Sequence, residues 1–238
     1  MKRLAVPLVV AAVLLGSCGA QEQGQGVGEM RNESRSIQPE DAESVRAHLV
    51  MGAGELKVGG AADALMEGDF SYNVADWKPQ IGYDVSGEEG ELTVEQGSGD
   101  DGRLGSGARN EWDLRFNDDV PTDLVVEMGA GESDLDLDSL ALTGLDLQMG
   151  AGETTVDLTG DYARDFDASI EGGVGEATVL VPSEVGVRVR AEGGLGKIEA
   201  EGFQREGEAY VNDAYGDSEV TLEVDVRGGV GSINLEVV

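Results

Sequence analysis

A five-residue signature recurs six times along the chain and constrains the fold more than any other feature. Three copies read Met-Gly-Ala-Gly-Glu and three have the looser form Gly-Gly-x-Gly. The copies occupy residues 51–55, 128–132, 149–153, 172–176, 193–197 and 228–232. Each copy follows one strand-like run and precedes another, and those from 128 to 193 are spaced 21, 23 and 21 residues apart. Repeats of that period are typical of a solenoid, in which each coil buries its apolar face against its neighbours.

The glycines of the signature are expected to have a structural role. Glycine tolerates positive φ and lets stacked backbones approach closely, so the signature predicts tight bends. The glycines concerned are Gly52, Gly54, Gly129, Gly131, Gly150, Gly152, Gly173, Gly175, Gly194, Gly196, Gly229 and Gly231. We predict that Gly129, Gly150, Gly173 and Gly194 lie in one line, each at a strand-to-strand turn. We also predict positive φ for the second glycine of a copy, such as Gly152.

Alternation of apolar and polar residues predicts that the rest of the body is made of half-buried strands. The clearest runs are 135–137, 145–147, 185–189 and 220–226, and the one short helical candidate is Ala61–Met66. The sequence therefore predicts an all-β fold, a glycine-punctuated, solenoid-like stack of short strands. A β-sandwich whose hairpin turns carry the signature is the alternative. Identical pentapeptides favour the solenoid, because they imply equivalent environments.

The start of the chain has the parts of a bacterial lipoprotein signal. Lys2 and Arg3 precede an apolar stretch, residues 4–15, that is too short to span a membrane. The following Leu-Gly-Ser-Cys is similar to the lipobox, and its Cys18 is the only cysteine of the chain. We expect a signal peptide over 1–17, export, cleavage before Cys18 and attachment of lipid, palmitate included, to that cysteine. The membrane is then a partner through this lipid.

The position of the anchored body follows from the next residues. Residues 18–43 are polar and lack periodicity, which predicts a flexible tether with an average reach of roughly 25–30 Å. Gly19 is not the aspartate that retains lipoproteins in the inner membrane of enterobacteria. The outer membrane is therefore the default location if the cell has one.

Charge limits the range of partners. The chain has 48 acidic and 16 basic residues and a net charge of −32. Loss of residues 1–17 would remove Lys2 and Arg3 and give −34. Such a charge repels phosphate backbones, which argues against nucleic acid as a partner.

Several stretches, taken in order, resemble the toast-rack family. They are NEWDLRFNDDVPTDLVVEMGAGESDLDL (110–137), LDLQMGAGETTVDL (145–158), EGGVGEATVLVPSEVGVRV (171–189) and YVNDAYGDSEVTLEVDVRGGVGSINLE (210–236). Residues 48–60 and 65–74 resemble its N-terminal domain, and the C-terminal part is similar to the domain named after LiaF, a membrane protein that restrains a sensor of cell-wall stress. The resemblance implies an all-β body of stacked slices with an N-terminal domain over 44–117 and a LiaF-like domain over 118–238. It implies little chemistry.

Residues for catalysis or cofactor binding are scarce. His48 is the only histidine and no GxSxG-like turn accompanies it, so neither a Ser-His-Asp triad nor a typical zinc set is expected. Residues 97–102 fit G-x-G-x-x-G but are followed by more loop, not by the helix that a dinucleotide site needs. A calcium roll needs aspartate at the sixth position of each repeat. The six copies have Leu56, Ser133, Thr154, Ala177, Ile198 and Ile233 there. We therefore expect no cofactor, no metal and no enzyme.

Two further sets of residues are candidate binding sites. The residue after each GxG would form a column of Glu132, Glu153, Glu176 and then Lys197, which either points into water or holds a cation. We favour the exposed column. A second set of aromatic residues could line a glycan groove, although packing in the core or at its ends is the preferred interpretation. These are Tyr72, Trp77, Trp112 and Tyr215.

The sequence thus predicts a non-catalytic, lipid-anchored module of the cell envelope with a structural, adhesin-like or partner-binding role. Its partner would be an envelope protein or polymer. The alternative is a regulatory component of a cell-envelope stress response, like LiaF. A glycosidase that uses only acidic residues needs two carboxylates roughly 5–10 Å apart in a cleft, and no pattern places such a pair.

Overall fold

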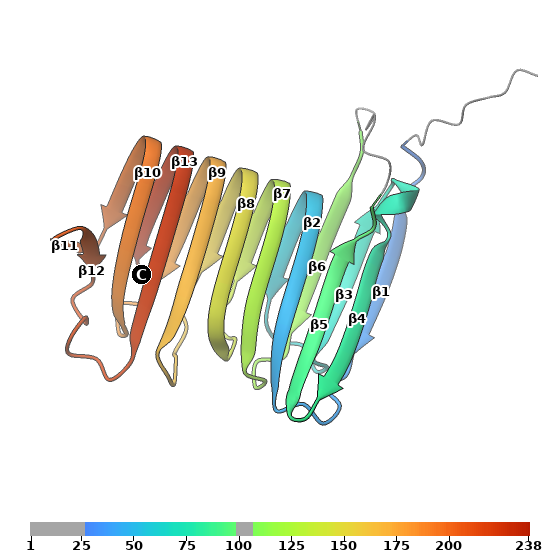
Figure 1. Cartoon of the computed structure of the whole chain (residues 1–238), viewed down its shortest axis with the longest axis horizontal. Helices are drawn as coiled ribbons and strands as arrows, with labels where there is room; N and C mark the ends of the chain where they lie inside the picture. Colours follow the sequence, from blue (N-terminus) through green and yellow to red (C-terminus); the bar gives the residue numbers. More distant parts are fainter. Residues whose placement is uncertain (1–26, 99–106) are drawn as a thin grey trace, which may run out of the picture.

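The computed structural model describes residues 27–98 and 107–238 of the chain. Apart from one 3-10 turn, η1 (Ala75–Trp77), the regular structure of these residues is entirely β. The strands are β1 (Arg31–Ile37), β2 (Ser44–Gly59), β3 (Met66–Tyr72), β4 (Pro79–Ser86), β5 (Glu89–Gln96), β6 (Asn110–Phe116), β7 (Thr122–Asp136), β8 (Leu142–Asp157), β9 (Phe166–Val181), β10 (Gly186–Glu201), β11 (Gln204–Glu206), β12 (Ala209–Val211) and β13 (Thr221–Val237). They form a single mixed sheet (Figure 1). The predicted all-β class is confirmed.

Six long strands, β2, β7, β8, β9, β13 and β10, make up most of the sheet, and each carries one copy of the signature near its middle. Figure 1 shows these strands bending over along one edge of the molecule and returning on its other side. We call the part before the signature the first arm and the part after it the second arm. The row of six signatures, where the strands bend, is the crest. The bends therefore lie inside continuous strands, not at turns between separate strands as the sequence predicted.

The long strands run parallel to one another and are in register through the crest. Gly129 stands beside Gly150, and Gly150 beside Gly173, because the residues flanking these glycines pair one to one. The predicted line of glycines is thus present. However, β13 lies between β9 and β10, so Gly229 separates Gly173 from Gly194.

The core lies between the two arms. In β7, Leu124, Val126 and Met128 are buried before the bend, and Ser133 and Leu135 are buried after it. Buried positions therefore change from even to odd numbers across the signature. This change of phase is needed because both arms must point their apolar side chains toward the same interior.

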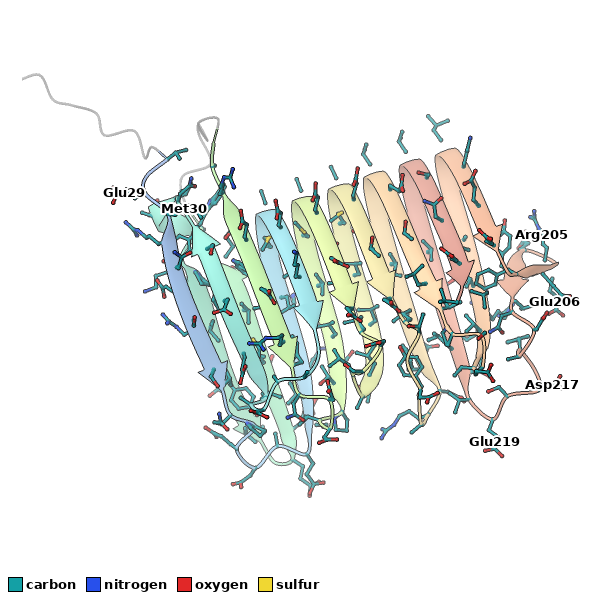
Figure 2. All side chains as sticks on the ribbon, turned by 180° about the vertical axis from the view of Figure 1, so that it is seen from behind. Glu29, Met30, Arg205, Glu206, Asp217 and Glu219 are labelled. Carbon is teal, nitrogen blue, oxygen red and sulfur yellow. The ribbon has the colours of Figure 1, made fainter. Side chains whose placement is uncertain are left out.

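The two ends of the folded sheet are built differently. At the N-terminal end, β5 and β4 extend the layer of first arms, while β6, β3 and β1 extend the layer of second arms. Buried aromatic residues fill this end, and Phe70 meets Trp112 edge to face with ring centroids 5.4 Å apart. At the other end, where Figure 2 labels Arg205 and Glu206 of β11, β12 and β11 continue the sheet beside the first arm of β10 only.

Two local predictions were wrong. Residues 31–37, assigned to the flexible tether, form β1, which pairs with β3 along its length. Its polar side chains make specific bonds, such as the one from the Tyr72 hydroxyl to Glu33 at 2.6 Å, so no apolar pattern marked the strand. The helical candidate Ala61–Met66 is irregular until β3 begins at Met66. Ala62, Ala64 and Leu65 are nevertheless buried, which explains their apolar character.

The proposed division of the body at residues 117 and 118 corresponds to no break in the sheet, since β2 pairs directly with β7. The signal peptide, Cys18 and the first residues of the tether lie outside the described residues. Within the described part of the chain, no helix is long and apolar enough to cross a membrane.

Candidate functional site

The crest is the most regular surface of the molecule, and its second glycines explain its shape. Gly54, Gly131, Gly152, Gly175 and Gly231 have φ between +135° and +147°, a region that side chains other than hydrogen rarely tolerate. The prediction of positive φ for the second glycine is confirmed at Gly152 and at these four other copies, but not at Gly196 of β10. A Cβ placed on Gly152 would also lie 1.8 Å from the carbonyl oxygen of Gly131 in the next strand. Conformation and close approach therefore both require glycine.

The first glycines of the crest are required for a different reason. At Gly150 no positive φ occurs, but a Cβ there would lie 2.4 Å from the carbonyl oxygen of Gly129. Gly129, Gly173, Gly229 and Gly194 show the same conflict at 2.3 Å, each with the neighbouring strand's backbone. These positions exclude a side chain by contact alone. The strands can stack this closely only because neither column of glycines carries one.

An apolar ridge runs along the outside of the crest. It consists of the residue between the two glycines of each copy, which pair in register in the order Ala53, Ala130, Ala151, Val174, Val230 and Leu195. The side chains become larger toward β10. Val174, Val230 and Leu195 are 56%, 48% and 73% exposed. The molecule therefore presents an apolar strip to solvent at the end of the crest farthest from β1.

Acidic residues line one side of this ridge. Glu55 precedes the predicted column of Glu132, Glu153 and Glu176, and Ser232 separates Glu176 from Lys197. All four carboxylates are exposed. Three of them border a shallow hollow of about 350 Å³. Glu176 accepts hydrogen bonds from the Ser232 hydroxyl and from the side-chain amide of Asn234 on the neighbouring strand β13, each at 3.1 Å.

The acidic row does not assemble into a chelating site. Within residues 27–98 and 107–238, no group of three or more His, Cys, Asp or Glu side chains is placed to hold a metal ion. Parallel carboxylates on adjacent strands point outward into water instead of converging on one point.

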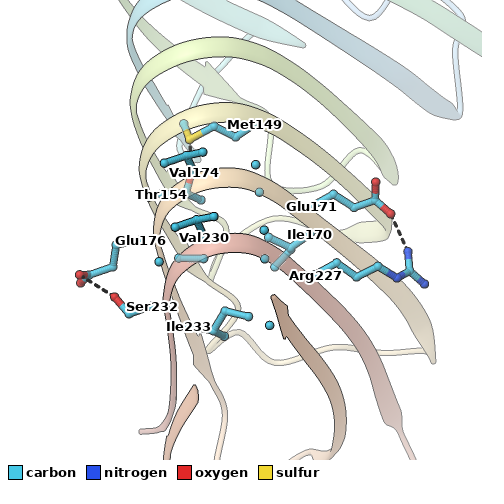
Figure 3. Close-up of a pocket in the computed structure, with 18 of the residues that line it drawn as sticks. Met149, Thr154, Ile170, Glu171, Val174, Glu176, Arg227, Val230, Ser232 and Ile233 are labelled. Atoms are coloured by element: carbon cyan, nitrogen blue, oxygen red, sulfur yellow. Dashed lines mark hydrogen bonds and ion pairs between the residues drawn. The ribbon is translucent and has the colours of Figure 1, made fainter. Parts of the chain in front are cut away.

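A hollow lies beneath the crest at β9, and two inward-facing positions explain it. At the inward-facing position before the bend, β2, β7 and β8 carry Met51, Met128 and Met149. The residue in register with them on β9 is Gly172, so a large side chain is missing at this position from β9 onward. In β13 and β10, isoleucine after the bend fills the space in front of the corresponding glycine. In β9 the residue after the bend is Ala177, and both positions are small. A cavity of about 30 Å³ remains there (Figure 3).

The outer rim of this hollow carries an ion pair, and its inner wall a sulfur contact. Arg227 on β13 pairs with Glu171 on β9 (Figure 3). The hydrogen bond that Arg227 donates to this carboxylate raises the pKa of its guanidinium above its ordinary value. The Thr154 hydroxyl lies 3.0 Å from the sulfur of Met149. The hollow is lined mainly by glycine backbone and apolar side chains.

Side chains close the N-terminal end of the crest. The Gln96 amide oxygen accepts hydrogen bonds from the backbone nitrogens of Gly52 and Ala53 at 2.9 and 3.2 Å. Asn110 donates to the carbonyl oxygen of Ala53 at 3.2 Å and to the Gln96 amide oxygen at 3.0 Å. These two amides satisfy groups that a further strand would otherwise pair. Neither residue could be predicted from the sequence, because capping by a distant side chain leaves no periodic signal.

The residues considered for catalysis or glycan binding are buried or half-buried, or contact a neighbouring side chain. His48 lies on the outer face of β2 and contacts the Glu127 carboxylate at 3.1 Å. Tyr72, Trp77 and Trp112 are buried and line no groove, and Tyr215 is half-buried. The sixth positions of the repeats are buried or partly buried. Of the G-x-G-x-x-G stretch, residues 99–102 lie outside the described residues, as does Cys18.

Together, the folded sheet and its glycine crest define an all-β repeat protein whose regularity lies in its backbone. Residues 26–180, about two thirds of the chain, match the family described as the N-terminal domain of toast_rack, DUF2154. The chain belongs to this family. No curated protein matches it at the level of sequence.

Solved structures are similar to the chain over most of its length. A "putative cell adhesion protein" from Clostridium sporogenes is 37% identical, with a TM-score of 0.86, and the match covers 88% of this chain and 100% of that one. A "putative adhesin" from Bacteroides fragilis is 10% identical, with a TM-score of 0.31, over 87% of this chain and 97% of that one. The first match extends the fold assignment to nearly the whole described body.

Proposed function

We propose that the protein is a non-catalytic, lipid-anchored module of the cell envelope with an adhesin-like, partner-binding role. The observation that carries this proposal is the similarity, over 88% of the chain, to the structure described as a "putative cell adhesion protein". The surface of the body is consistent with it. Its most regular feature is a long crest with an apolar ridge, and the hollow beneath that crest is lined mainly by glycine and apolar residues.

We also infer that the folded sheet is best understood as a short solenoid. Six strands with equivalent bends stack in register, and each buries its apolar face against the arms of its neighbours. Such a body is rigid along its stacking direction because every strand hydrogen-bonds to the next. A rigid body on a lipid anchor would hold its far end at a fixed place relative to its tethered end.

Anchoring through Cys18 is part of the proposal and has a direct test. In cells fed an alkyne analogue of palmitate, the native chain should be labelled and Cys18→Ala should not. Ser17→Ala is the matched control, because it keeps a small residue before the cysteine and should still be labelled. If Cys18→Ala remains membrane-bound through washing without detergent, another segment or a partner anchors the body.

Binding is tested with cells that lack the gene. The fluorescently labelled, processed chain in a non-ionic detergent should bind to their surface or to their isolated envelopes with a saturable isotherm. The regulatory alternative makes a different prediction, namely that deletion of the gene changes the output of a cell-wall stress reporter. Saturable binding with an unchanged reporter supports the adhesin-like role. A changed reporter without binding supports the regulatory alternative.

A further inference from the structure

The second arm of β10 is an open edge of the sheet. Residues Leu195–Glu201 pair with β13 on one side. On the other side, no strand of the described residues pairs with them, since β12 covers only Arg188–Arg190 of the first arm. Figure 1 shows β10 as the last long strand at this end. Unpaired N–H and C=O groups along such an edge are a template for another strand.

The core is also incompletely covered at this edge. Val179 and Val181 on β9, and Ile233 and Leu235 on β13, are the inward residues of the neighbouring second arms and are at most 3% exposed. The corresponding residues of β10, Ile198 and Ala200, are only partly buried. In the first arm of the same strand, Val187 and Val189 are fully buried. The layer of first arms is therefore continued past β10 by β12 and β11, whereas the layer of second arms ends at β10.

The two ends of the crest differ in the same way. At the N-terminal end, Gln96 and Asn110 bond to the backbone of β2 where a further strand would be. At β10, no side chain among the described residues takes that role, and Leu195 is the most exposed large apolar residue. The apolar ridge thus leads to an edge that has free backbone groups and half-covered apolar residues beneath it.

Charge indicates what kind of chain fits this edge. Lys197, Glu199 and Glu201 are exposed on its outer face, so two of its three charges are acidic, and the protein as a whole carries −32. A second copy would bring the same charge, so long-range repulsion opposes pairing of two bodies. A strand with basic residues on its outer face would meet opposite charges across the ladder. Apolar residues on its inner face would cover Ile198 and Ala200.

We propose that the second arm of β10, residues 195–201, binds an extended polypeptide of alternating apolar and basic residues by addition of a strand to the sheet. Backbone hydrogen bonds would supply affinity, and the side chains opposite Glu199 and Glu201 would supply selectivity. This inference rests on the proposed partner-binding function and names the surface and the partner chemistry. The opposite charge of the partner would also accelerate encounter at low ionic strength.

The probe is an acetylated, amidated nonapeptide of alternating valine and lysine, labelled with fluorescein. Fluorescence anisotropy with the processed full chain at 0.15 M salt should show saturable binding. Two control peptides should bind at least tenfold more weakly, one with glutamate in place of lysine and one with N-methyl groups on alternate backbone amides. Hydrogen exchange should show that the valine–lysine peptide protects residues 195–201.

A pair of charge variants identifies the surface. Glu199→Lys with Glu201→Lys should weaken binding of the lysine peptide about tenfold and strengthen binding of the glutamate peptide. Glu88→Lys with Glu89→Lys makes the same change of net charge at two exposed residues, one in the turn before β5 and one at the start of β5, and should leave both affinities nearly unchanged. Circular dichroism and thermal unfolding of both variants establish that each is folded.

Several results would overturn the inference. These are absence of binding, equal binding of the N-methylated peptide, protection at another segment, or equal effects of the two charge variants. Dimers in sedimentation experiments whose interface protects 195–201 would assign the edge to a second copy instead. If the double variant Glu199→Lys, Glu201→Lys binds the cell envelope as tightly as the native chain, the inference fails while the proposed function stands. If the peptide binds at the edge but cells bind nothing, the proposed function fails alone.

Discussion

Alanine substitutions in the crest should separate steric conflict from backbone strain. Gly150→Ala would place a Cβ 2.4 Å from the carbonyl oxygen of Gly129, and this backbone atom would have to move by roughly 1 Å to reach an ordinary contact. Overpacking of this kind costs about 1–3 kcal/mol. Weaker hydrogen bonds between β7 and β8 add about 1 kcal/mol. We expect a loss of about 3 kcal/mol, or roughly 6–12 °C in Tm for a body of this size.

Gly52→Ala is the matched control. It occupies the same place in the signature, but its Cβ would meet only the Gln96 side chain, at 3.6 Å. Its Tm should therefore equal or slightly exceed that of the native chain, since alanine restricts the unfolded state. Gly87→Ala isolates strain, because φ is +68° there and nothing lies within 4 Å of the new Cβ. It should cost about 1 kcal/mol.

Gly152→Ala combines strain and conflict and should cost more than Gly150→Ala. Differential scanning calorimetry of the processed chain gives the order of stability directly. The predicted order is Gly52→Ala, then Gly87→Ala, then Gly150→Ala, then Gly152→Ala as the least stable. If Gly150→Ala melts with Gly52→Ala, the strands do not approach as closely as the crest requires, and the reasoning is refuted.

Four further predictions concern the core, the acidic row and the titrating groups. Ala177→Ile should fill the hollow under β9 and raise stability by about 1 kcal/mol in urea unfolding, and a decrease would mean that the space is not free. Glu153→Gln should leave Tm unchanged or slightly higher; a lower Tm, with Ca²⁺ stabilising only the native chain, would reveal a cation site after all. The Tyr72 hydroxyl holds the pKa of Glu33 below its ordinary value, so this contribution to β1 docking is present above pH 4.5 and should be lost as the pH falls through the lowered pKa; hydrogen-exchange protection of β1 that is constant over this range would contradict it. The buried Tyr162 hydroxyl has no hydrogen-bond partner among the described residues, and burial raises its pKa; Tyr162→Phe should therefore cost nothing or stabilise by about 1 kcal/mol, and a clear loss would show an unrecognised bond.

Much of the fold could be predicted because the same local sequence pattern occurs six times. Glycine pairs that recur between alternating runs require equivalent bends, and equivalent bends stack. The order of the strands could not be predicted in the same way. The copies at 193 and 228 look like consecutive coils, yet β13 enters between β9 and β10. Parallel neighbours with the same pattern can exchange places without changing any local preference.

The ends of the sheet were the least predictable part. β1 is polar on both faces, and its pairing depends on contacts such as Tyr72 with Glu33, which are distant in sequence. Gln96 and Asn110 close the crest through single amide groups that no pattern distinguishes. The change from Met149 to Gly172 was visible in the sequence. Its consequence, the hollow beside Ala177, required knowledge of which residues face each other across the bend.

The central claim is that the anchored body binds a partner on the cell envelope without performing chemistry. It is tested most directly by measuring, with the labelled processed chain, the binding isotherm on cells that lack the gene, with and without an excess of the unlabelled processed chain. We predict saturable binding of the labelled chain that the unlabelled chain displaces. Binding that is absent, or that the unlabelled chain does not reduce, would contradict the account.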